Sequence, residues 1–272
     1  MLKWSLSAVL VAISLGTVAT AMADDPGGPS LQEQAQNPIA SLISVPIQFD
    51  VNFNVGDLDR TQLITNVQPV YPATLSDDWN LIIRPIVPIV RNPSLFEGDD
   101  STFGLGDINP QFFFTPSDSV DTIFGTMTWG VGPSFFLPTA TDDELGTGKW
   151  SVAPGAVVFI SNAPWTYGFL AQNYWSFAGD DDRDEVRQFV FQPFVNHNLS
   201  DGWSLVTAPT IIANWEADDR RWTVPLGGGI QKLLKIGNQP VNATVRSYYN
   251  VLSPVSGPDW QIEAQITFLF PK

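Results

Sequence analysis

The 272-residue chain carries 13 basic and 28 acidic residues, a formal net charge of −15, and it contains no cysteine. This balance disfavours nucleic acids and polyanionic ligands as partners, and the absence of thiols excludes disulfides and cysteine-bound metals. No apolar run after the first 23 residues is long enough for a transmembrane helix.

Residues 1–23 have the features of a cleaved signal peptide. Lys3 supplies a positive charge, residues 6–18 are apolar, and Ala21-Met22-Ala23 is a small-residue cleavage site. A membrane anchor is disfavoured because the apolar core is short and no stop-transfer pattern follows. We therefore expect export from the cytoplasm. Cleavage removes Lys3 and no acid, so the expected mature chain carries a net charge of −16.

Residues 24–41 form a separate N-terminal segment. Its first residues, 24–29, are rich in glycine and proline and favour a flexible chain. Ser30 and Glu33 have the spacing of a capping box, which predicts a short helix that Asn37 and Pro38 would end. The segment is either an unstructured periplasmic lead-in or a small plug inside the domain that follows.

From residue 42 to the C-terminus, apolar and polar residues alternate in twelve stretches. Side chains of a strand point alternately to opposite faces, so each stretch predicts a strand with one apolar and one polar face. Several stretches contain proline, which removes a ladder hydrogen bond and predicts bulges or breaks; these prolines include Pro46, Pro69, Pro85, Pro154, Pro193, Pro209 and Pro225. The stretches are 43–55, 63–71, 79–89, 103–114, 123–137, 150–160, 165–177, 186–196, 203–215, 221–233, 241–251 and 260–270.

The last stretch, 260–270, shows the repeating unit most clearly. Trp260 and Phe270 mark its ends, its even positions are apolar, and its odd positions are polar except for Leu269. A strand of about ten residues with aromatic ends is the unit of a transmembrane barrel. The repetition predicts an all-β fold, a transmembrane antiparallel up-and-down β-barrel of about 12 strands spanning residues 42–272.

The connections fall into two classes that alternate along the chain. Short turns alternate with mostly longer loops, and the long loops contain 17 of the 28 acids. Barrels of this kind have short periplasmic turns and longer outer loops, so we expect both termini in the periplasm. The acidic outer loops would bind divalent cations weakly and bridge to lipopolysaccharide phosphates.

Tryptophans gather at the strand ends, where an indole suits the membrane interface. This sorting disfavours the rival class, a secreted β-sandwich that binds a ligand. The predicted membrane-interface girdles are Trp79, Trp165 and Trp203 beside short turns, and Trp150, Trp175, Trp215, Trp222 and Trp260 beside long loops.

Polar residues in the strand middles share the parity of the inward face. Charges there would be costly in lipid, so we assign them to the lumen. Twelve strands lie between about eight, where side chains fill a barrel, and about sixteen, where water does. Both a pore and a closed polar core therefore remain open. The predicted lumen or selectivity residues are Asp50, Arg84, Asp107, Arg246, Glu263, Gln48, Asn52, Gln188 and Gln192.

The strand register predicts contacts among these charges. Arg246 should reach Glu263 diagonally on the neighbouring strand. Arg84 and Asp50 lie two strands apart, so their link should run through an amide of Asn66 or Gln68.

We predict no catalytic residue, no cofactor and no metal site. His197 is the single histidine, no G-x-S-x-G motif is present, and we interpret His197 as a turn residue. The acidic run 180–185 fails the spacing of a calcium-binding EF-hand loop. Gly227, Gly228 and Gly229 lie within a strand and predict close backbone packing or a kink. An outer-membrane hydrolase remains the third class.

Seven motifs resemble the outer-membrane transporter-like barrels grouped as meta-pathway phenol-degradation proteins, often auto-labelled "neuromedin U". They cover nearly the whole mature chain: NPIASLISVP (37–46), FGLGDINP (103–110), LPTAT (137–141), LGTGKW (145–150), ANWEA (213–217), WTVPLGGG (222–229) and FLFPK (268–272). The resemblance implies a barrel with a transport role and brings no catalytic residue and no substrate. Pro271 and Lys272 depart from the aromatic end usual in such barrels.

These patterns predict an outer-membrane channel that passes small neutral or cationic solutes by passive diffusion. The alternative is a closed structural or binding barrel without an open pore. The expected partners are outer-membrane lipid and lipopolysaccharide, an unidentified small solute, and the barrel-assembly machinery and periplasmic chaperones during biogenesis. Nucleic acid is not expected.

Overall fold

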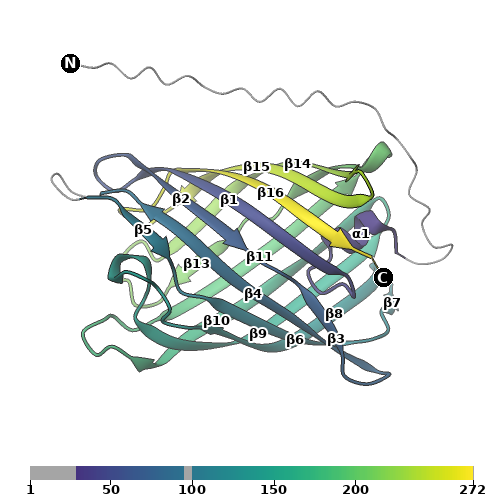
Figure 1. The fold of residues 1–272 in the computed structure, drawn as a ribbon, viewed down its shortest axis with the longest axis horizontal. Coiled ribbons are helices and arrows are strands. Elements are labelled where there is room, and N and C mark those ends of the chain that lie inside the picture. Colours follow the sequence, from purple (N-terminus) through teal and green to yellow (C-terminus); the bar gives the residue numbers. More distant parts are fainter. Residues whose placement is uncertain (1–28, 95–99, 272) are drawn as a thin grey trace, which may run out of the picture.

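The computed structural model describes residues 29–94 and 100–271, in which one antiparallel sheet closes on itself as a barrel (Figure 1). The sheet has sixteen strand segments, and pairing of β10 with β11 completes the circle. Closure leaves no free sheet edge with unpaired backbone groups. The predicted all-β antiparallel barrel is therefore confirmed.

The chain order is helix first, then strands interrupted by two short 3-10 turns. The elements are α1 (Leu31–Gln36), β1 (Ile43–Val55), β2 (Arg60–Val67), β3 (Tyr71–Thr74), β4 (Trp79–Asn92), β5 (Thr102–Leu105), β6 (Asn109–Pro116), β7 (Val120–Thr122), β8 (Gly125–Phe136), η1 (Asp143–Leu145), β9 (Lys149–Asn162), β10 (Trp165–Gly179), β11 (Arg187–Asn198), η2 (Ser200–Gly202), β12 (Trp203–Thr207), β13 (Ile211–Asn214), β14 (Trp222–Ile236), β15 (Gln239–Leu252) and β16 (Trp260–Phe270).

The sixteen segments form twelve barrel strands. Three of the barrel strands are interrupted. Segments β2 and β3 both pair with β4 and form one strand, and β5 and β6 form another strand on the other side of β4. Segments β12 and β13 both pair with β11 and form the third. Segment β7 pairs only with the start of β8 and extends that hairpin. Two of the interruptions contain Pro69 and Pro209, which have no amide hydrogen to donate. Pro225 lies at a register shift in β14, whereas Pro46, Pro85, Pro154 and Pro193 lie within uninterrupted strands, so the prediction of bulges or breaks at prolines is correct for some of them and wrong for others.

The two faces of the wall differ as the alternation predicts. In β1, Phe49 is 44% exposed whereas the adjacent Asp50 is 6% exposed. In β16, Ile262 and Ile266 are exposed and Glu263 between them is buried. The apolar face therefore points outward and the polar face inward, the reverse of a soluble sandwich. Leu269 breaks this pattern because it points inward and is fully buried.

The N-terminal helix forms as the capping box predicts. Ser30 caps α1 by accepting from the Glu33 amide, and the Glu33 carboxylate accepts from the Ser30 amide. Asn37 ends the helix. The helix lies at the barrel end that also holds the C-terminus (Figure 1). The predicted signal peptide lies outside the described residues. No helix of the described part of the chain is long and apolar enough to cross a membrane.

Candidate lumen site

A strip of charged and amide side chains crosses the inner wall from β15 to β4. Glu263 in β16 is directly opposite Arg246 in β15 on one side and Asp50 in β1 on the other. The Arg246 guanidinium forms an ion pair with Glu263, and both side chains are largely buried, at 13% and 7% exposure. It also donates to Gln265 Oε1 at 3.3 Å. The predicted pair is confirmed, although its residues face each other directly rather than diagonally.

Asp50 is held by amides rather than by a cation. Its carboxylate accepts from Gln48 Nε2 at 3.0 Å, from Asn66 Nδ2 at 3.1 Å and from Gln261 Nε2 at 3.4 Å. No lysine or arginine of the described residues forms an ion pair with Asp50. Its negative charge is thus stabilised by neutral hydrogen-bond donors and, without direct ion pairing, by the nearby charge of Arg246.

Arg84 is linked to the same strip through amides, as predicted. Its Nη2 donates to Gln68 Oε1 at 2.6 Å, and Gln68 Nε2 donates to Gln48 Oε1 at 3.3 Å. Gln48 in turn donates to Asp50. Arg84 has no carboxylate within ion-pair distance among the described residues. The strip therefore contains one unpaired guanidinium and one unpaired carboxylate.

The structure does not bring Asp107 together with the other four charges. Asp107 lies between β5 and β6 and accepts from the backbone amides of Ala140 at 3.2 Å and Thr147 at 2.7 Å. A Cβ at Gly146 would lie 2.5 Å from Asp107 Oδ1, so glycine lets this loop close onto the carboxylate. Asp107 thus anchors the loop between β8 and β9.

Three of the predicted amides lie at different levels of the wall. Asn52 Nδ2 donates to Gln62 Oε1 at 2.8 Å, and Gln62 donates to Asn92 at 2.7 Å, which forms an amide ladder near the long-loop end. Gln192 donates to Thr210 Oγ1 at 3.1 Å, inside the break between β12 and β13. Gln188 faces Tyr174 and Asn214 in register.

Helix α1 contacts the inner wall through polar side chains. Gln32 Nε2 donates to Ser204 Oγ at 2.7 Å, and Gln36 Nε2 donates to Asn198 Oδ1 at 2.8 Å. Thr166 donates to Gln36 Oε1 at 2.7 Å. These partners belong to β10 and β11 and to the start of β12, so the helix is fixed to one side of the barrel interior.

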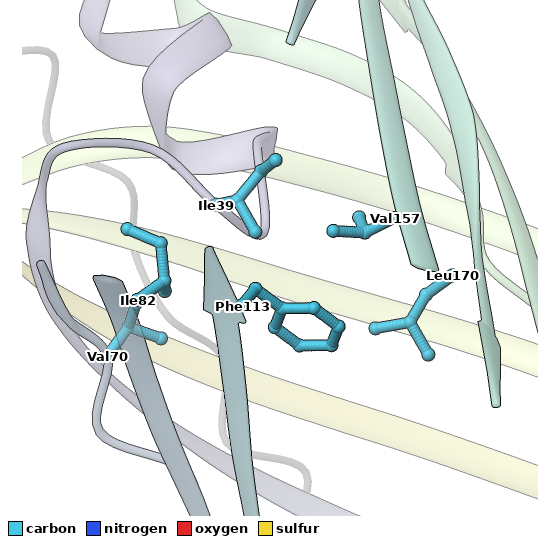
Figure 2. Close-up of a cluster of buried hydrophobic side chains, with 6 residues drawn as sticks. All are labelled: Ile39, Val70, Ile82, Phe113, Val157 and Leu170. Carbon is cyan, nitrogen blue, oxygen red and sulfur yellow. The ribbon is translucent and has the colours of Figure 1, made fainter. Parts of the chain in front are cut away.

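The chain after the helix fills the lumen with apolar side chains. Ile39 is 1% exposed and packs with Val70 and with inward residues of four strands (Figure 2). The cluster of buried side chains is Ile39, Val70, Ile82, Phe113, Val157 and Leu170. A second cluster joins Ala40 and Leu42 to Leu269. Leu269 is at an inward position of β16, and this segment covers its apolar side chain.

A cavity of about 150 Å³ lies between residues 34–42 and the inner wall. Arg84 and Arg246 both line it, together with amides that include Gln48 and Gln192. Asp50, Asp107 and Glu263 do not. The cavity is therefore lined by guanidinium and amide groups together with apolar side chains, some of which, such as Leu170, also belong to the apolar cluster around Ile39.

Several interior residues were not among the predicted site residues. Lys149 points inward at the start of β9. In the sequence it follows an acidic loop, so the pattern there indicates a loop residue and not an interior one. Gln231 shares its parity with the inward glycines of β14 and could have been assigned from that pattern. The glutamines of α1 gave no signal, because a six-residue helix does not reveal which surface it meets.

At the long-loop end, Lys149 binds Glu185 at 3.4 Å, and the Ser176 hydroxyl donates to the same carboxylate. The Ser176 hydroxyl, followed by the charge of Lys149, lowers the pKa of Glu185 below its ordinary value. A further ion pair, between Arg187 and Glu216 at 2.9 Å, is exposed. No group of three or more possible metal ligands occurs among the described residues.

The predicted girdle tryptophans lie at strand ends. Seven of the eight are exposed, and Trp203 is half-buried beneath Lys232, whose Nζ lies 4.8 Å from the ring centre. His197 packs on Trp165 with ring centres 4.3 Å apart and belongs to β11 rather than to a turn. Its neighbours Asn196 and Asn198 face the interior, so His197 points away from the lumen.

Comparison with solved structures places this fold among outer-membrane barrels. An outer membrane channel from Pseudomonas putida F1 superimposes with a TM-score of 0.63 at 14% identity, covering 85% of this chain and 96% of that one. Outer membrane phospholipase A from Escherichia coli gives a TM-score of 0.49 at 12% identity, covering 89% and 95%. No protein-family model and no curated protein matches the chain. The family resemblance of the motifs therefore stays a prediction.

Proposed function

We propose that the protein is an outer-membrane channel that passes small neutral or cationic solutes by passive diffusion. The observation that carries the proposal is the inverted wall, with an apolar face outward and a charge-bearing polar face around an internal cavity. Such a wall is stable when lipid surrounds it, because charges on the lipid side would be costly. The likeness in fold to an outer membrane channel supports the same location.

The solute preference follows from the charge arrangement. Along the strip, the two guanidiniums of Arg84 and Arg246 balance the two carboxylates of Asp50 and Glu263. The mouth is not balanced, because the long loops carry most of the acids. A negative mouth raises the local concentration of cations and lowers that of anions, and salt screens the effect. Net-negative solutes are therefore disfavoured at entry.

A planar lipid bilayer holding the purified full-length protein tests the proposal. We expect small conductance steps with a reversal potential that favours potassium over chloride, and a preference that weakens at high salt. Chloride preference at low salt would contradict the proposed selectivity. Recovery of the protein as a soluble periplasmic species, with no change in gel mobility between unheated and boiled samples, would refute the membrane location.

A second candidate, a closed barrel, is favoured by the apolar cluster around Ile39. In that case residues 31–40 would block permeation permanently. A variant that lacks residues 31–40 distinguishes the two. If the wild type is silent and the deletion conducts, the barrel is closed at rest and the segment is its block. If both conduct alike, the segment does not control passage.

A further inference from the structure

The lumen cavity has an unusual set of lining groups. It is bounded by two guanidiniums, by several amides and by apolar side chains such as Leu42 and Leu170, and none of the carboxylates in residues 29–94 and 100–271 lines it. Arg246 is neutralised by Glu263, its in-register neighbour on β16. Arg84 remains as the cation that faces the cavity without an ion-pair partner in the described part of the chain.

An uncompensated guanidinium inside a barrel is energetically unfavourable. Removing a charge from bulk water is costly unless a counter-charge or several hydrogen bonds replace the lost hydration. Arg84 can donate five hydrogen bonds, yet one bond, to Gln68, is its partner among the described residues. A planar guanidinium with free donors is well shaped to bind a carboxylate through two parallel hydrogen bonds.

Unpartnered polar atoms gather where β14 and β15 line the same cavity. Gln231 Nε2, Asn242 Oδ1 and Arg246 Nε are buried and have no hydrogen-bond partner among the described residues. Gln231 is 93% buried and Asn242 is 98% buried, since their exposures are 7% and 2%. All three residues line the cavity from adjacent inward positions of β14 and β15. Buried polar groups normally have partners, so this cluster indicates a ligand that supplies both donors and acceptors.

Two constraints then define the ligand. The cavity, at about 150 Å³, matches the size of a cavity that holds a benzene molecule, so the ligand has few heavy atoms. Arg84 requires a carboxylate, whereas the acidic mouth of the proposed channel disfavours a net-negative solute. A carboxylate that also carries an ammonium group satisfies both requirements, because it is neutral overall.

We propose that this cavity is a binding site for a small zwitterionic carboxylate of amino-acid size. Arg84 binds the carboxylate, and the ammonium group donates to Asn242 Oδ1 on the β15 side. The inference rests on the proposed channel function, for which it names the solute class. The apolar lining contributed by Ala40, Leu42 and Leu170 contacts the short carbon chain that joins the two charged ends.

Isothermal titration of the full-length protein in detergent micelles tests the site with β-alanine, propionate and propylamine as probes. We expect saturable binding of β-alanine and at least about tenfold weaker binding of the two singly charged probes, since each lacks one charged hydrogen-bonding group. Arg84→Gln should weaken β-alanine binding at least about tenfold, and Arg84→Lys should weaken it less, because it keeps the charge. Arg91→Gln is the matched control, since Arg91 lies on the same strand and is exposed.

Each outcome of these titrations either supports the proposed zwitterion site or overturns it. Unchanged binding in Arg84→Gln, or equal binding of propionate and β-alanine, overturns the proposed site or its zwitterion preference. If Arg84→Gln does not give the heat-dependent gel shift of a folded barrel, Asn242→Leu is tested in its place. Asn242→Leu should weaken the binding of β-alanine at least about tenfold and weaken the binding of propionate less. Absence of β-alanine binding in a wild type that conducts overturns this inference alone. Binding without conductance refutes the channel and leaves the site standing.

Discussion

Replacing Arg246 by methionine should destabilise the barrel strongly. The change removes the cation that pairs with Glu263, whose side chain is 7% exposed and lies directly opposite Asp50. Two carboxylates would then face each other inside the wall without a counter-charge. Breaking a buried pair by removing one partner costs about 3–5 kcal/mol, because the remaining charge is uncompensated. The lost hydrogen bond to Gln265 adds to this cost.

Guanidinium unfolding in micelles, followed by tryptophan fluorescence, measures the free energy of unfolding. The matched control is Arg187→Met, which breaks the ion pair with Glu216, where the side chains are 58% and 37% exposed. Exposed pairs contribute at most about 1 kcal/mol. The double variant Arg246→Met/Glu263→Met should recover most of the loss, because no unpaired charge remains from the pair. If Arg246→Met costs no more than Arg187→Met, the lumen pair is solvated and our interpretation of the charged strip is wrong.

Three further predictions concern the loops, the strands and the N-terminal segment. Because the folded pKa of Glu185 is lowered, the contribution of Glu185 to stability is complete above its ordinary pKa of 4.5 and is lost as the pH falls through the lowered value. Amide exchange in the loop between β10 and β11 should therefore become faster in acid. The Glu185→Gln variant should not show this pH dependence. Gly229→Ala should prevent folding, because the added Cβ would lie 1.8 Å from the Val245 carbonyl oxygen. The control Gly130→Ala should fold, because its Cβ would meet no atom closer than 3.3 Å. Equal heat-dependent gel shifts in the two variants would contradict this prediction. Ile39→Ala should weaken the packing of the segment by about 2–5 kcal/mol and raise conductance in bilayers, and an unchanged conductance would show that the segment does not gate.

The strands were largely predictable from sequence, because a period of two over about ten residues is a strong signal. The expected bounds of 43–55 and 260–270 match β1 and β16, and Pro69 and Pro209 correctly located two breaks. The pairing of Arg246 with Glu263 also followed, since parity and strand order fix which inward residues are neighbours. Gly227 and Gly229 pack closely on the β15 backbone, as expected.

Loop contacts and the N-terminal segment were less accessible to sequence reasoning. Asp107 has the parity of the lumen, yet the break between β5 and β6 lets it bind a loop instead. Whether a polar strand residue meets solute or loop depends on how a connection folds back, and no periodicity encodes that. For residues 29–41 the capping box predicted a helix correctly but could not say what the helix would contact.

The inward apolar residues give a way to recognise such a segment. A polar inner face that met only water would have no reason to include Leu269, Ile82 or Phe113 on its side of the wall. Each is costly to expose and becomes favourable only when another apolar group covers it. Ile39 covers Ile82 and Phe113, and Ala40 and Leu42 cover Leu269. At Ile82, Phe113 and Leu269, an apolar residue on the polar inner face therefore marks where residues 39–42 dock. In the proposed channel, selectivity would be set by the strip from Arg84 to Arg246, whose two guanidiniums line the cavity beside this segment.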